Sequence, residues 1–146
     1  MDTAFSLVEK LVALAHPTIV GLHSLLGVTL SPVNNANQYW SFYEAHPSSG
    51  LVARVDFREP VRGASKYEPL LVVTLRDAPV RLQDLSHKYD QGRIIDLSHH
   101  HPGFVGYTHV VHGRDVSFKI DSKSERVLAF SIDYSTTPHG SKKRGP

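Results

Sequence analysis

The alternation of apolar and polar residues between positions 116 and 134 constrains the fold more than any other feature of this sequence. Apolar side chains occupy every second position on both sides of the polar segment 121–125: Val116, Phe118, Ile120, Leu128, Phe130, Ile132 and Tyr134. A period of two is typical of a strand with one buried face, and a short polar segment is typical of a turn. The sequence therefore predicts a hairpin, with a third strand at 107–112 and a turn at 112–115.

An apolar face of this width has to be covered, and the helical patterns that can cover it lie upstream. A first helix is expected after a capping residue, Asp2 or Thr3, and before Pro17, because proline disfavours the helical conformation of the residue before it. A second begins at the capping residue Thr18 and ends at Gly27, a residue type that readily adopts left-handed angles. A third is predicted in 79–92, with one apolar stripe made by Leu82, Leu85 and Tyr89.

Three more strands are predicted in the first half of the chain, at 40–43, 51–58 and 70–76. In the second of these, Leu51, Ala53, Val55 and Phe57 are expected to face the core. A helix followed by three strands then occurs twice, first in 18–76 and again in 79–134.

The sequence thus predicts an α+β fold in which N-terminal helices pack on one face of a mostly antiparallel sheet. Residues 1–138 are expected to form a single domain, and 139–146 a flexible basic tail. In architecture alone, this pseudo-repeat resembles beta-lactamase-inhibitor-like domains. The resemblance implies a binding protein rather than an enzyme.

Composition excludes several classes of protein. With 40% hydrophobic residues and no apolar run near the roughly 20 residues that span a bilayer, a membrane protein is not expected. The net charge is +2, but three basic residues lie in the tail, so the rest of the chain is close to neutral. A nucleic-acid partner is therefore not favoured. The first fifteen residues are typical of a helix rather than a signal peptide, which slightly favours the cytoplasm; the periplasm is the alternative if a leader was removed.

The strongest candidate for chemistry is the run Asp96–His101, in which Asp96, His99 and His101 offer ligands that zinc accepts. These residues motivate one alternative function, a metal-assisted hydrolase. No cysteine, no Gly-x-Ser-x-Gly sequence and no phosphate-binding glycine loop is present. The sequence therefore favours a non-catalytic protein without a cofactor.

The remaining candidates are Tyr43, Arg54 and Arg58, which are expected to share an exposed face of the sheet. Tyrosine and arginine are enriched in protein–protein binding hot spots. The leading hypothesis is a small domain that binds a protein partner, as an inhibitor or a toxin-neutralising immunity protein does. A structural subunit of a larger assembly is the third alternative.

Overall fold

The computed structural model describes residues 3–33, 39–61, 69–77, 79–89, 93–95 and 103–134. These residues form three helices and eight strands. In chain order they are α1 (Ala4–Val12), α2 (Ile19–Leu26), β1 (Ser31–Pro32), β2 (Trp40–Ala45), β3 (Val52–Pro60), β4 (Leu70–Leu75), α3 (Leu82–Lys88), β5 (Arg93–Ile95), β6 (Phe104–Val111), β7 (Arg114–Asp121) and β8 (Val127–Asp133).

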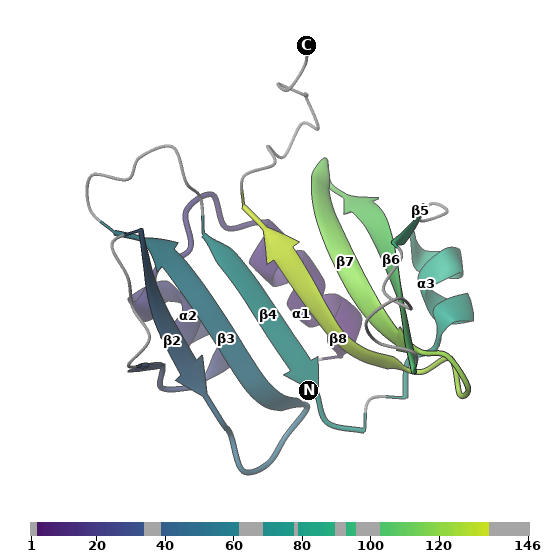
Figure 1. Cartoon of the computed structure of the whole chain (residues 1–146), viewed down its shortest axis with the longest axis horizontal. Helices are drawn as coiled ribbons and strands as arrows, with labels where there is room; N and C mark the ends of the chain where they lie inside the picture. The colour runs from purple at the N-terminus through teal and green to yellow at the C-terminus, as the bar shows by residue number, and fades with distance from the viewer. Residues whose placement is uncertain are drawn as a thin grey trace.

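The strands form one antiparallel sheet in the order β1-β2-β3-β4-β8-β7-β6-β5. The two halves of the sheet meet where β4 pairs with β8, from Leu70 opposite Asp133 to Thr74 opposite Ala129. Helices α1 and α2 lie behind the sheet, on one of its faces (Figure 1). The predicted α+β fold, with N-terminal helices on one face of an antiparallel sheet, is confirmed.

The predicted repeat is present with one more strand in each half than expected. Helix α2 is followed by β1–β4, and α3 is followed by β5–β8. The two extra strands, β1 and β5, contain two and three residues and lie at opposite edges of the sheet. Such short strands leave no measurable alternation in a sequence, which is why they were missed.

The predicted helix caps account for where the first two helices begin. The hydroxyl oxygen of Thr3 accepts a hydrogen bond from the amide of Ser6 at 3.1 Å, and that of Thr18 accepts one from Gly21 at 3.0 Å. Each bond satisfies an amide that has no partner within its helix. Gly27 ends α2 with φ at 69°, a left-handed conformation that glycine adopts without steric cost. Among the described residues, no helix is long and apolar enough to cross a bilayer.

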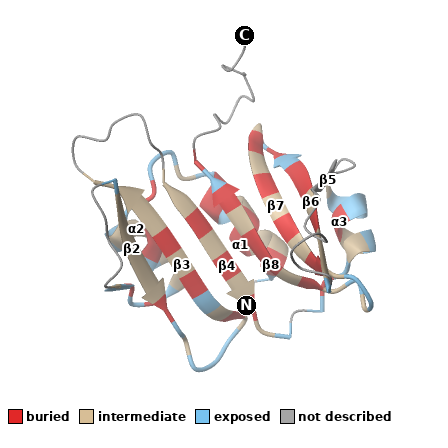
Figure 2. Ribbon diagram, in the orientation of Figure 1, coloured by how far each residue is buried: buried red, intermediate tan, exposed pale blue. Residues whose placement is uncertain are grey.

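The core lies between the helices and the sheet. Buried residues alternate with half-buried ones along the central strands (Figure 2). Helix α1 contributes five buried side chains, and the strands meet them with aromatic and branched side chains, among them Phe57, Leu71, Val73, Phe130 and Ile132. This arrangement buries the apolar face that the alternation predicted.

Two β-bulges change which residues face the core. In β3 the pairing shifts between Val52 and Arg54, and Val52 is buried while Ala53 is only half-buried. Near the start of β8 the pairing shifts so that Val127 is buried and Leu128 is half-buried. The predictions that Ala53 and Leu128 face the core were wrong because a bulge reverses the phase of the alternation. Leu51, before the bulge in β3, packs against the core as predicted.

The turn between β6 and β7 is also tighter than predicted. Only His112 and Gly113 form it, with φ at 51° and 81°, as a two-residue hairpin turn requires. Arg114 and Asp115 therefore belong to β7. The Arg114 side chain is 2% exposed, with its guanidinium carbon 4.8 Å from the centre of the Tyr134 ring. No pattern in the sequence indicated that this cation would be buried.

We expect Phe130→Ala to lower the free energy of unfolding by roughly 3–5 kcal/mol, because it leaves a cavity in the core. Phe130 is 1% exposed and its ring lies 6.2 Å from that of Phe118. Urea unfolding of the two proteins measures the difference. Leu128→Ala, at the half-buried bulge, is the control and should cost clearly less. Equal losses in the two variants would contradict the assignment of the buried face.

Candidate functional site

The structure separates the three residues that were expected to share a surface. Tyr43 pairs with Phe57, and residues directly opposite in an antiparallel pair point to the same face. The two rings lie 6.4 Å apart on the helix side of the sheet. Arg54 and Arg58 alternate with the buried Val55 and Phe57, so they point to the other face. The prediction of one shared face is thus wrong for Tyr43 and correct for Arg54 and Arg58.

The face opposite the helices, here called the open face, is the one turned towards the viewer in Figure 1. No helix of the described residues covers it. In the first half of the chain it presents large side chains on three neighbouring strands. Phe42, Arg58 and Leu70 form one cross-strand row, since Arg58 pairs with both of the others. Trp40 and Val72 lie on the same face in the adjoining rows, and all five residues are half-buried. We call Trp40, Phe42, Arg58, Leu70 and Val72 the Arg58 patch.

Arg54 is neutralised within the protein. Its Nε and Nη2 atoms donate to the carboxylate of Asp56 at 2.8–3.1 Å, and Nη2 lies 3.2 Å from Glu44. Glu44 also bonds His46 at 2.7 Å. Arg54 therefore belongs to a local network of charges, in which each member already has a partner.

Arg58 has a different environment on the same strand. Its guanidinium carbon lies 4.1 Å from the centre of the Trp40 ring, a cation–π contact. The Nε atom is buried without a hydrogen-bond partner, and no described carboxylate forms an ion pair with Arg58. The patch therefore holds a positive charge that no ion pair of the described residues neutralises, against Trp40 and between Phe42 and Leu70. Carboxylates border the patch, since Glu44 and Asp56 lie in the adjoining row and Asp133 pairs with Leu70.

A second group of polar side chains joins three distant segments. The hydroxyl of Tyr89 donates to Oε2 of Glu9 at 3.0 Å, and Nε2 of His112 bonds Oε1 of the same carboxylate. Burial raises the pKa of Tyr89. Partial burial also raises the pKa of Glu9, but the hydrogen bonds from His112 and Tyr89 outweigh it, so the net pKa lies below its ordinary value. The group connects α1 to the end of α3 and to the β6–β7 turn, and it stabilises the packing of these segments.

The residues predicted to bind zinc, Asp96, His99 and His101, lie outside the described residues. Within the described ranges, no three histidine, aspartate or glutamate side chains are grouped so that they could hold a metal ion. The metal-assisted hydrolase consequently stays a hypothesis from the sequence.

Sequence reasoning did not identify Trp40 and Phe42 as part of this surface. Both alternate sets of residues in their strand contain aromatic side chains, Trp40 and Phe42 in one and Tyr43 in the other, so alternation alone does not show which set points inwards. The pairing with β3 determines which set of residues points inwards.

Comparisons of the chain with protein-family models, with curated protein sequences and with solved structures found no match.

We expect Tyr43→Ala to lower the free energy of unfolding by about 1–3 kcal/mol, because the ring packs against the core on the helix side. Tyr39→Ala is the control, since Tyr39 is among the exposed large side chains and its loss should have little effect. Chemical unfolding of both variants provides the measurement. Equal stability of the Tyr43 variant and the wild type would place Tyr43 on the open face instead.

The group around Glu9 predicts a dependence of stability on pH. Because folding lowers the pKa of Glu9 from 4.5, its ionised form stabilises the fold above that pH, and the stabilisation is lost as the pH falls through the folded-state pKa. The free energy of unfolding of Glu9→Gln should therefore fall less steeply below pH 4.5 than that of the wild type. The exposed Glu125, changed to Gln, is the control and should leave the wild-type profile unaltered. Identical profiles for all three proteins would show that Glu9 is not linked to folding.

Proposed function

We propose that this protein is a non-catalytic domain that binds another protein through the Arg58 patch. The observation that carries the proposal is the environment of Arg58: a cation held against Trp40, without a described carboxylate partner, in the middle of half-buried apolar side chains. Tryptophan and arginine are the residues most often found at the centre of binding hot spots, where water is excluded.

The chemistry of the patch specifies the surface that fits it. A complementary partner presents an apolar area with one aspartate or glutamate near its centre. Its carboxylate would neutralise Arg58, and its apolar area would cover Phe42, Leu70 and Val72. The contact with Trp40 already restricts the arginine side chain, which lowers the entropy that binding would otherwise cost.

The sheet itself supports this proposal. The patch spans three strands in continuous antiparallel pairing, which holds its side chains in fixed relative positions before a partner arrives. A rigid surface of this kind suits tight binding of a folded protein, because little ordering remains to be done on association. An inhibitor or a toxin-neutralising immunity protein is the class of binding protein that we propose.

The test is a comparison of variants against one purified partner. Wild-type protein is used to isolate a stoichiometric partner from the native source, and the complex is reconstituted from purified components for calorimetry. We expect Arg58→Ala to weaken binding by roughly 2 kcal/mol, the scale of an interface anchor, and Arg58→Glu to weaken it further through repulsion of the partner's carboxylate.

Arg54→Ala is the matched control, because it removes the same charge from the same strand and face. Arg54 already has Asp56 and Glu44 as partners, so its replacement should change the affinity much less. Circular dichroism checks that all variants fold. Equal effects of the Arg54 and Arg58 variants, or no effect of Arg58→Glu, would show that the partner binds elsewhere.

A further inference from the structure

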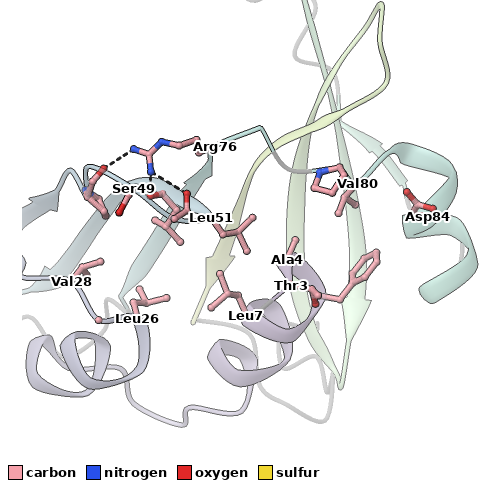
Figure 3. A pocket seen from close by; sticks show the side chains of 16 residues that line it. Thr3, Ala4, Leu7, Leu26, Val28, Ser49, Leu51, Arg76, Val80 and Asp84 are labelled. Carbon is pink, nitrogen blue, oxygen red and sulfur yellow. Dashed lines mark hydrogen bonds between the residues drawn. The ribbon is translucent and has the colours of Figure 1, made fainter. Parts of the chain in front are cut away.

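A cavity of about 850 Å³ lies on the helix side of the sheet, away from the Arg58 patch. It is bordered by the first turn of α1, the C-terminal end of α2, the β2–β3 hairpin and the segment that leads into α3 (Figure 3). This volume lies within the range of sites for small molecules, which is roughly 300–1,000 Å³. No part of the proposed protein-binding function uses it.

The wall of the cavity is mostly apolar. Leu7 comes from α1, Leu26 and Val28 come from the end of α2, and Leu51 and Val52 come from the hairpin and β3. Figure 3 shows Leu7, Leu26, Val28 and Leu51 around a common space, reached from both the helices and the hairpin. Such a lining favours a ligand with an apolar body, because binding removes apolar surface of both molecules from water.

One end of the cavity carries a positive charge, that of Arg76. Its Nη1 atom donates to the carbonyl oxygens of Gly50 and Val52 at 3.0 and 3.2 Å, and Nη2 donates to that of Pro47 at 2.6 Å. These three acceptors are neutral. They fix the position of the guanidinium without balancing its charge, and no described carboxylate forms an ion pair with it. The Nε donor takes part in none of these bonds.

Among the described residues of the lining, the single carboxylate belongs to Asp84, at the opposite end of the cavity from Arg76 (Figure 3). This carboxylate accepts a hydrogen bond from the amide of Arg81 at 2.9 Å, as part of the capping of α3. The polarity of the cavity is therefore uneven, with an unbalanced cation at one end only. A ligand with one acidic group would be oriented by this difference.

We propose that the cavity binds a small amphipathic carboxylate, with its acidic group at Arg76 and its apolar body between α1, α2 and Leu51. The apolar side chains of the lining would contact the body of the ligand, and the fixed guanidinium would donate a charge-assisted hydrogen bond to its carboxylate. The site is separate from the Arg58 patch and does not depend on the proposed protein partner.

Calorimetric titration with decanoate and decanol, each below its aggregation limit, tests the proposal. The two probes share an apolar chain and differ in charge. We expect decanoate to bind the wild-type protein with one-to-one stoichiometry, and at least about ten-fold more tightly than decanol, because of its bond to Arg76. Arg76→Gln keeps an N–H donor for the hairpin carbonyls and should remove this preference.

Arg81→Gln is the matched control, since Arg81 also donates to a carbonyl oxygen, that of Ser124, and does not line the cavity. It should keep the preference for decanoate. Ser49→Trp provides an independent variant: Ser49 is exposed at the edge of the lining, and a large ring there should obstruct both probes without disturbing the core.

The proposal is overturned if neither probe gives saturable binding to the wild type, or if the two bind equally. It is also overturned if the Arg81 and Arg76 variants lose the preference alike, since binding would then follow net charge. Should Arg76→Gln fail to fold, Ser49→Trp decides: unchanged decanoate binding in that variant excludes the cavity.

Discussion

The pairing of β4 with β8 is the interaction on which the rest of the structure depends. Each half of the chain forms its own four-stranded meander, and these strands alone join the two meanders into one sheet. Helix α1 belongs to neither repeat and lies behind this junction (Figure 1). Its buried side chains cover the apolar faces of both halves, and the hydroxyl of Tyr134 donates to the carbonyl of Leu11 at 2.7 Å. The helix thus stabilises the junction in addition to covering it.

Because the helices occupy one face, the two halves are free to differ on the other. The first half presents the large side chains of the Arg58 patch. The second half presents small side chains, including Thr108 and Ser117, whose hydroxyl groups bond each other at 3.0 Å. It also presents Phe104, with the Lys119 amine 3.9 Å from the centre of its ring, and the exposed Val110. The topology repeats, whereas the side chains on the open face differ between the two repeats.

The sequence predicted most of this architecture because period-two alternation is a local property. Alternation does not predict which residues face the core where a partner strand determines their orientation. Nothing local distinguishes Trp40 and Phe42 from Tyr43 and Ala45 as inward-facing residues, so only the register with β3 sets the phase. Bulges have the same effect at Ala53 and Leu128. The cavity beside Arg76 could not be predicted from the sequence, because four segments that are distant in the chain line it.

The two proposed sites lie near opposite ends of β3 and on opposite faces of it. Val52 lines the cavity on the helix side, and Arg58 lies six residues later on the open face. A strand rises about 3.3 Å per residue, so the sites are separated by roughly 20 Å along β3. They share none of their residues, and continuous pairing with β2 and β4 holds the strand between them. At this separation, substitutions without common partners act additively. We therefore expect that the proposed carboxylate in the cavity and the proposed protein on the open face bind independently of each other.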